Sequence, residues 1–362
     1  MLTEQLRTSA LPLNAIRLAL ALSVIIAHSS PLSGICCGVS INPNLDLGLA
    51  AVGSFFALSG LLVTMSAMRQ SGSSYLVARI RRIFPAYLLV LTATALVLAP
   101  IIHTLTTGGL GGFAWGGEQG PIAYLLGNAS LSVNTHYYIN DVFEGTTPFG
   151  GVNGSIWTLP IEFRAYLIAL VVVLVGKRVG LTRSAVAALC ITTSLILLGR
   201  FYPGLVRSVL PEFLPASYLP LVFVFLCGSV VATVAHRVTL THTLGVAAIA
   251  VLIAALQMND PLFVPIGLGT LAIVLPYLAS LLPTRPFGWF TNDLSYGAYL
   301  WGFPVAQVLA FAGLNSLGLV PFALLSILCT LPFAAVSWFL VERRFIKRHA
   351  AAKGANRQEL GQ

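Results

Sequence analysis

The chain has 362 residues, of which 57% are hydrophobic and only 9% are charged. A soluble domain carries about 25% charged residues, so this composition excludes a chain that lies entirely in water. The net charge of +9 would suit nucleic acid in a soluble protein, but membrane proteins gather Lys and Arg in their cytoplasmic loops. The five cysteines form no Cys-x-x-Cys pair, and the sequence predicts neither a metal site nor a disulfide framework.

Apolar segments recur along the whole chain, and each is about as long as the 20 or so residues that cross a bilayer as a helix. They are continuously apolar and do not alternate as the strands of a membrane barrel do. We therefore expect an all-α integral membrane protein with about ten transmembrane helices. The predicted spans cover residues 13–30, 47–68, 83–103, 156–176, 182–199, 218–236, 240–257, 262–281, 292–312 and 318–341.

The basic residues indicate how these helices are oriented. With alternating helices, most of them fall on one side of the membrane, namely Arg7, Arg69, Arg79, Arg81, Arg82, Lys177, Arg178, Arg183, Arg237, Arg285, Arg343, Arg344, Lys347, Arg348, Lys353 and Arg357. The opposite loops hold only Arg200 and Arg207. Because positively charged loops stay in the cytoplasm, both termini are predicted to be cytoplasmic. Residues 1–342 then form one transmembrane domain, and residues 343–362 form a basic cytoplasmic tail.

The loop of residues 104–155 is long, contains no Lys or Arg, and is predicted to face outward. Loops of this length are usually functional or disordered. Its aromatic residues include Trp115, Tyr137, Tyr138 and Phe149. They suit contact with a sugar, and they equally suit a belt at the membrane interface.

Ionisable side chains inside a bilayer are costly, which makes Arg17 and His28 of the first span functional candidates. They are eleven residues apart, so a helix places them within about 20° of the same direction and about 16 Å apart. A guanidinium near the cytoplasmic side can hold a phosphate or a carbonyl. A histidine near the outer side can act as a general base toward a hydroxyl. The alternative is that each pairs structurally with a neighbouring helix.

Residues 153–162 (Asn-Gly-Ser-Ile-Trp-Thr-Leu-Pro-Ile-Glu) enter the fourth span from outside. Pro160 weakens the helix there, which frees backbone groups that can line a cavity. Glu162 can orient or charge-stabilise His28, as a carboxylate does in a catalytic triad. The alternative is a salt bridge to another helix. A bridge to Arg164 is not expected, because residues two apart point to different faces.

Two further segments stand out, one for its small residues and one for its arginines. Residues 53–60 (Gly-Ser-Phe-Phe-Ala-Leu-Ser-Gly) carry small residues that favour close helix packing. Arg79 and Arg82 are three residues apart on one predicted helix face, where they can bind a phosphorylated ligand. Their charge alone favours the alternative, in which they serve as a topology signal or contact lipid headgroups.

Six motifs occur in order along nearly the whole chain. They are Arg17 with His28 and residues 28–34 (His-Ser-Ser-Pro-Leu-Ser-Gly), then residues 54–60, 79–85, 153–162, 294–304 and 338–342. Together they resemble the membrane acyltransferase-3 family, which contains bacterial O-antigen, exopolysaccharide and peptidoglycan O-acetyltransferases. Each motif alone is weak, but the ordered set is specific.

The resemblance implies that an acyl group, acetyl by the family's example, moves from cytoplasmic acyl-CoA to a hydroxyl of an extracytoplasmic carbohydrate or glycoconjugate. It implies a bacterial cytoplasmic membrane, the lipid bilayer as surroundings and acetyl-CoA as donor substrate. We expect no metal from the cysteine pattern, and no nucleic acid because the basic residues are scattered over short cytoplasmic loops. The implied site residues are His28 and Glu162 for catalysis, Arg17, Arg79, Arg82 and Ser59 for the donor, and Asn153, Trp157, Tyr296 and Tyr299 for the acceptor or the shape of the site.

The chain departs from the family pattern at two positions. Asn14 stands where many members have Asp, and Gly302 stands where many have His. Without that second histidine, a two-histidine mechanism is not supported. The main alternative function is a transporter or flippase for a lipid-linked sugar, which ten helices with kinking prolines would also suit. A receptor or structural membrane protein is a second alternative. Acceptor identity and acyl chain length stay open.

Overall fold

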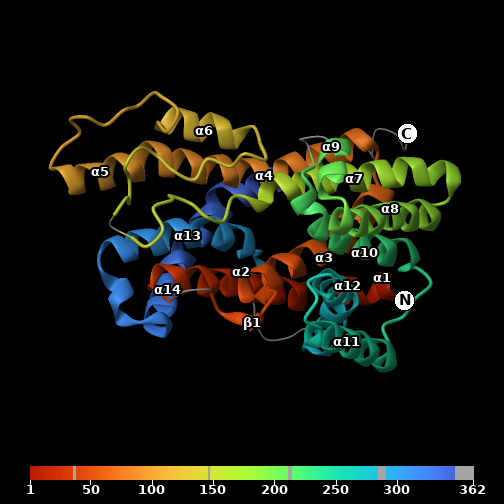
Figure 1. The fold of residues 1–362 in the computed structure, drawn as a ribbon. Helices are drawn as coiled ribbons and strands as arrows, with labels where there is room; N and C mark the ends of the chain where they lie inside the picture. Colours follow the sequence, from red (N-terminus) through yellow and green to blue (C-terminus); the bar gives the residue numbers. More distant parts are fainter. Residues whose placement is uncertain (36–37, 146, 211–213, 284–290, 347–362) are drawn as a thin grey trace, which may run out of the picture. The chain divides into compact units, whose positions relative to one another are not determined.

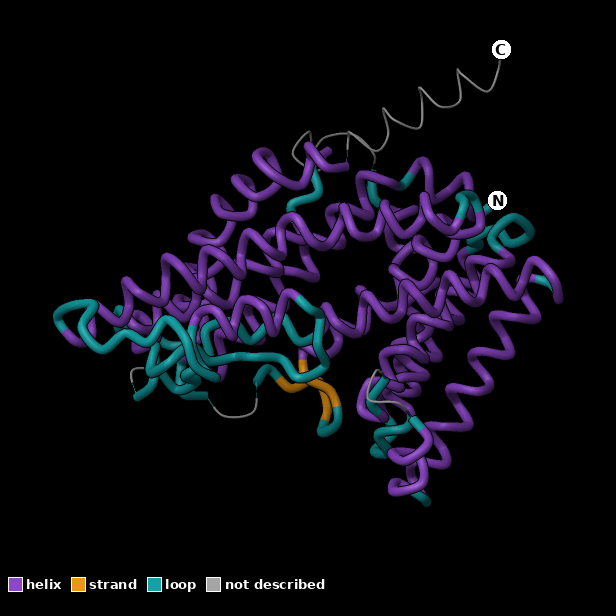
Figure 2. Tube along the Cα trace, turned by 90° about the horizontal axis from the view of Figure 1, so that it is seen from above, coloured by secondary structure: helices purple, strands orange, loops and turns teal. Residues whose placement is uncertain are grey.

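The computed structural model describes residues 1–35, 38–145, 147–210, 214–283 and 291–346. Nearly every described element is a helix, and the only strands in these ranges form one short hairpin (Figure 1, Figure 2). The chain divides into two compact units. Unit 1 comprises Met1–Val24, Gly38–Gly72 and Trp157–Asn292, and unit 2 comprises Ile25–Cys37, Ser73–Ile156 and Asp293–Gln362. Arg285 and most of the predicted tail lie outside the described residues.

Unit 1 holds the first part of α2 and most of the central third of the chain. Its described elements are α1 (Leu2–Thr8), α2 (Ala10–Leu32) as far as Val24, β1 (Ser40–Asn42), β2 (Leu45–Asp46), α3 (Leu47–Met68), α7 (Thr158–Val179), α8 (Leu181–Phe201), α9 (Pro203–Val209), the 3₁₀ helix Ala216–Tyr218, α10 (Leu219–Val234), α11 (His242–Gln257) and α12 (Phe263–Leu281). The hairpin is antiparallel and leads directly into α3. Asp46 caps that helix by accepting a hydrogen bond of 2.8 Å from the amide of Leu49.

Unit 2 holds the end of α2, the long outer loop and the C-terminal helices. Its described elements are α4 (Gly72–Ala93) from Ser73 onward, the π segment Thr94–Leu98, α5 (Ala99–Thr107), α6 (Pro121–Ala129), α13 (Ser295–Phe311), the 3₁₀ helix Leu314–Leu317, α14 (Leu319–Ser337) and the π segment Trp338–Glu342. A small apolar core joins the end of α2 to α13 and α14 through Leu32, Ala306, Ala310 and Phe322. Asn315 also donates a hydrogen bond of 2.9 Å to the carbonyl of Leu32.

Eight of the described helices are long and apolar enough to cross a membrane. They are Ala10–Leu32, Leu47–Met68, Gly72–Thr107, Thr158–Val179, Leu181–Phe201, Ala216–Val234, Phe263–Leu281 and Leu319–Ile346. This confirms a multi-pass, all-α membrane protein. The other two predicted spans also coincide with helices, but α11 has only 16 residues and α13 only 17. The count of ten and the cytoplasmic termini therefore stay predictions, as does the division at residue 342.

The predicted span 83–103 is the middle of a longer helix. The chain is helical from Gly72 to Thr107, which is 36 residues. At 1.5 Å per residue this helix is about 54 Å long, so it extends beyond the roughly 30 Å hydrocarbon layer. Pro100 lacks the N–H that would bond back along the helix, and the π segment Thr94–Leu98 lies just before it. The apolar pattern marked the membrane part and missed the polar helical extension.

Small residues bring α3 against α10 in the core of unit 1. A Cβ at Gly60 would lie 1.9 Å from the carbonyl oxygen of Phe225, and one at Gly228 would lie 2.3 Å from that of Ala57. The two backbones therefore touch, as at the small-residue interfaces of membrane helices. Thr64 strengthens the pair by donating a hydrogen bond of 2.9 Å to Ser229. The structural interpretation of residues 53–60 as a packing segment is confirmed.

Candidate active site

The predicted site residues are divided between the two units. Arg17, Ser59, Trp157 and Glu162 belong to unit 1, whereas His28, Arg79, Arg82, Asn153, Tyr296 and Tyr299 belong to unit 2. Helix α2 is continuous from Ala10 to Leu32, so Arg17 and His28 lie on one helix as expected. Both side chains are partly buried. Arg17 and His28 are therefore separated by three turns of α2, as the sequence predicts.

Phe303 of α13 lies against the candidate catalytic histidine. The ring centroids of His28 and Phe303 are 5.0 Å apart at an angle of 83°, an edge-to-face contact. Helix α13 approaches α2 closely because residue 302 is glycine. A Cβ at Gly302 would lie 2.6 Å from Cγ1 of Ile25, which is three residues before His28. The departure at position 302 therefore has a local steric reason in this chain.

The end of the outer loop is bound to α13 by hydrogen bonds beside this contact. Asn153 donates from Nδ2 to the carbonyl of Leu300 at 3.2 Å, and its Oδ1 accepts from the amide of Ser155 at 3.0 Å. Tyr299 donates its hydroxyl proton to the carbonyl of Ser155 at 2.7 Å. The structure thus brings together two predicted residues, Asn153 and Tyr299, through the backbone that they both bind.

Glycine at position 154 lets the same loop segment lie on the ring that contacts His28. A Cβ at Gly154 would come within 2.6 Å of Phe303. Phe149 adds a second aromatic contact, with its ring centroid 5.5 Å from that of Phe303. Residues 149–155, the collar, therefore pack on α13.

Gln307 is a residue of this region that the sequence reasoning missed. It is fully buried, and its Nε2 donates to the carbonyls of Phe149 and Gly151, both in the collar. Within the described residues, its Oε1 and the buried hydroxyl of Ser155 have no hydrogen-bond partner. A signal was present, because Gln307 is the only polar side chain in the apolar run 300–310.

Arg82 is the centre of an ion-pair network at the other end of α13. Its guanidinium lies 2.6 Å from Oδ2 of Asp293 and 3.7 Å from Oε2 of Glu342, which is 1% exposed. It also lies 5.5 Å from the centre of the Tyr296 ring, and the Tyr296 hydroxyl donates to the carbonyl of Ile83 at 2.9 Å. Two carboxylates thus face one guanidinium, and they connect α4 to the start of α13 and the end of the α14 segment.

Arg79 lies one turn before Arg82 on α4 in different surroundings. Its guanidinium lies 5.7 Å from the centre of the Tyr75 ring, which is a cation–π distance. Donor binding by either arginine stays a prediction. The Arg82 guanidinium already forms ion pairs with Asp293 and Glu342, which join three helical segments. Asp293 was not among the predicted residues, because a single acid at a helix start resembles an ordinary cap.

The site residues of unit 1 have local partners. Glu162 accepts a hydrogen bond from the Tyr166 hydroxyl one turn further along α7. Arg164 is buried, and its guanidinium donates to the carbonyl of Pro160 at 2.7 Å. Trp157 directly precedes α7, and Ser59 is partly buried beside Gly60 on α3. Across the described ranges no three His, Cys, Asp or Glu side chains gather as metal ligands.

Taken together, the fold is that of a multi-pass α-helical membrane protein with ionisable residues inside its helices. Comparison with known proteins supplies the class. Residues 12–340 match the family model of an acyltransferase domain, that of the acyltransferase-3 family. The chain belongs to this family, and it is an acyltransferase. The resemblance carried by the six motifs is therefore confirmed.

Two relatives agree with this assignment. The chain is 29% identical to an O-acetyl transferase of Shigella phage Sf6 over 360 residues, which cover 92% of this chain and 95% of the relative. It is 27% identical to nodulation protein 10 of Rhizobium leguminosarum bv. viciae over 318 residues, 82% of each chain. No solved structure matches the chain significantly.

Proposed function

We propose that the protein is a membrane O-acetyltransferase that moves an acetyl group from cytoplasmic acetyl-CoA to a hydroxyl of an extracytoplasmic carbohydrate or glycoconjugate. The family match over residues 12–340 supports acyl transfer, and the phage relative supports acetyl as the group. The proposed location is a bacterial cytoplasmic membrane, with ten helices and both termini in the cytoplasm. A transporter or flippase is not favoured, because the matching family is one of acyltransferases.

The observation that carries the mechanism is the position of His28, on a spanning helix and edge-on to Phe303. His28 takes the proton from the acceptor hydroxyl, whose oxygen forms the new bond to the thioester carbonyl carbon. The carbon–sulfur bond then breaks, and the CoA thiolate leaves and receives the proton from His28. The products are an acetyl ester and free CoA, so atoms and charges balance. The imidazole ends the cycle neutral.

Arg17 lies about 16 Å further along α2, in the direction from which a cytoplasmic donor would arrive. In this proposal Arg17 contacts a phosphate or carbonyl of CoA, since a guanidinium binds such groups well. The donor-binding role of Arg79 rests on the family resemblance. Arg82 holds the donor-side end of α13 in place through Asp293 and Glu342. The roles of Glu162, Ser59, Trp157 and Tyr296 rest on the family resemblance alone.

The test is release of CoA by purified protein supplied with acetyl-CoA, with and without bacterial surface polysaccharides, for wild type and His28→Ala. We expect polysaccharide-stimulated release that falls about a thousandfold in the variant, within the usual range for general acid–base catalysis. His242→Ala is the matched control, because this histidine pairs with Tyr277 in unit 1 and should not affect transfer. A folded His28→Ala protein with wild-type release would refute the mechanism.

A further inference from the structure

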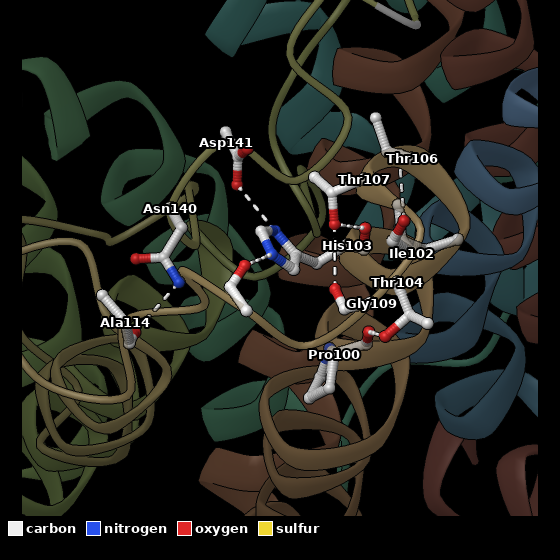
Figure 3. A network of polar contacts seen from close by, with 11 residues as sticks. Pro100, Ile102, His103, Thr104, Thr106, Thr107, Gly109, Ala114, Asn140 and Asp141 are labelled. Carbon is white, nitrogen blue, oxygen red and sulfur yellow. Dashed lines mark hydrogen bonds and ion pairs between the residues drawn. The ribbon is translucent and has the colours of Figure 1, made fainter.

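A buried histidine organises the outer loop of unit 2. His103, near the end of α5, is 6% exposed. One ring nitrogen lies 3.3 Å from Oδ1 of Asp141, and the other lies 3.3 Å from the carbonyl oxygen of Gly111. Figure 3 shows the contact between His103 and Asp141. The ring thereby connects α5 to two parts of the loop that are far apart in the chain, around Gly111 and Asp141.

An exposed tryptophan, Trp115, packs on Phe113, and Phe113 packs on His103. Phe113 lies 5.1 Å from His103 between ring centroids, and Trp115 lies 5.0 Å from Phe113 at an angle of 83°. Phe113 is buried, whereas Trp115 is 46% exposed. The loop thus presents a large, partly exposed aromatic side chain that packs on Phe113, which in turn packs on His103.

Two polar side chains lie in the part of the loop that is hydrogen-bonded to the residue before Trp115. Asn140 donates from Nδ2 to the carbonyl of Ala114 at 2.9 Å, directly before Trp115 in the chain (Figure 3). Its backbone is left-handed, with φ of 46°, and its amide donates to the carbonyl of Gln119 at 2.7 Å. The next residue, Asp141, has a side chain that is 54% exposed. The Asn140 side chain therefore binds the residue next to Trp115, and the Asp141 carboxylate that contacts His103 stays partly exposed in the same loop.

A row of packed rings leads from the same loop to the candidate catalytic histidine. Tyr138 is 48% exposed and lies two residues before Asn140. Its ring centroid is 6.3 Å from that of Phe149, which is 5.5 Å from Phe303, which in turn is 5.0 Å from His28. Tyr138 and His28 are therefore the two ends of one row of packed rings within unit 2.

We propose that Trp115, Asn140, Asp141 and Tyr138 form a carbohydrate-binding subsite that holds the acceptor outside the reacting centre. A pyranose ring presents apolar C–H faces that pack on an indole, and its hydroxyls hydrogen-bond to amides and carboxylates. The loop offers both kinds of group on a preorganised base, which lowers the entropic cost of binding. The subsite rests on the proposed acetyl transfer to carbohydrate, and it adds where that acceptor is held.

A tryptophan that merely anchors the loop in the membrane interface would need only its amphipathic ring. It would not need the hydrogen-bonded junction with Asn140 or the exposed carboxylate of Asp141. The two uses also respond differently to substitution. Leucine preserves an apolar side chain suited to the interface but lacks the flat face that a sugar requires, so Trp115→Leu separates them.

The experiment measures binding of full-length protein in lipid nanodiscs to an array of bacterial O-antigen and exopolysaccharide preparations. Wild type is compared with Trp115→Leu, Trp115→Phe and Asp141→Asn. Tyr202→Leu is the matched control, because Tyr202 is an aromatic residue of unit 1 that is 61% exposed. Gel filtration and thermal unfolding check that each variant is folded. Acetyl transfer to any polysaccharide that binds is measured on the same samples.

We expect Trp115→Leu to weaken polysaccharide binding about tenfold, the usual effect of losing an aromatic anchor. Trp115→Phe should keep most of the affinity, and Tyr202→Leu should keep all of it. In transfer assays Trp115→Leu should raise KM for the polysaccharide far more than it lowers kcat. Equal binding by wild type and Trp115→Leu, or no binding by wild type, would overturn the subsite. Wild-type binding without any acetyl transfer would instead refute the proposed function.

Discussion

Gln307 offers the sharpest test of how the collar supports the catalytic histidine. Its amide donates to the carbonyls of Phe149 and Gly151, and the collar in turn lies on Phe303 beside His28. Gln307→Leu keeps a similar volume in the apolar run and removes both hydrogen bonds. The change should loosen residues 149–155 without emptying the core around them.

The size of the effect follows from the polar groups involved. Two carbonyls that lose their donor cost about 2 kcal/mol each, or about 4 kcal/mol together. The substitution also removes Oε1, a buried oxygen without a hydrogen-bond partner among the described residues, which returns about 2 kcal/mol. The net local destabilisation is about 2 kcal/mol, equivalent to about a thirtyfold increase in opening of the collar.

Hydrogen exchange read by mass spectrometry measures this opening directly. The amides of Val152 and Ser155 are the reporters, since each donates a hydrogen bond in the folded loop. We expect about thirtyfold faster exchange there, together with a lower kcat and an unchanged KM for acetyl-CoA. Gln5→Leu is the matched control, because Gln5 also makes two hydrogen bonds, to the backbone of Leu240 in unit 1.

The control should leave exchange in residues 149–155 unchanged. Wild-type exchange in Gln307→Leu would show that the two hydrogen bonds do not hold the collar. Faster exchange with unaltered kcat would show that the collar does not position His28, and the reasoning that links it to catalysis would fail.

Two further predictions concern stability. Arg82→Ala leaves the carboxylates of Asp293 and Glu342 without their cation, so we expect a loss of about 3–5 kcal/mol, visible as a lower midpoint in thermal unfolding. Asp293→Asn should be milder, and an unchanged midpoint for Arg82→Ala would exclude a structural role. Gly228→Ala should prevent α3 from packing on α10 and abolish folded protein in gel filtration. Gly72→Ala, whose Cβ would meet only Leu170 at 3.7 Å, should fold normally.

Helix positions were largely predictable from sequence because burial in lipid demands continuous apolar runs. All ten predicted segments coincide with described helices, and α3 has the same bounds as the predicted span 47–68. The pattern missed the polar extension of α4 and the short helices α6 and α9. Those elements lie at or beyond the ends of the apolar runs, so hydropathy carries little information about them.

The candidate site was only partly predictable for a related reason. Arg17 and His28 stand out because a charge in an apolar segment is rare, and their relation follows from helix geometry within one segment. The ion pair of Arg82 with Asp293 joins residues 211 positions apart, and no local pattern reports such a partner. The same holds for Gln307, whose partners in the collar lie 156 and 158 residues away.

The sequence by itself determined the class of this protein, because composition, spacing and ordered motifs are local properties that survive without a fold. It identified a helical membrane protein, the acyltransferase family and the ionisable residues of α2. Only the tertiary structure decided which side chains meet. It placed Phe303 against His28, gave Arg82 two carboxylate partners, and set Trp115 on the rings of Phe113 and His103. Those contacts depend on packing between segments far apart in the chain, which hydropathy and motif spacing do not encode.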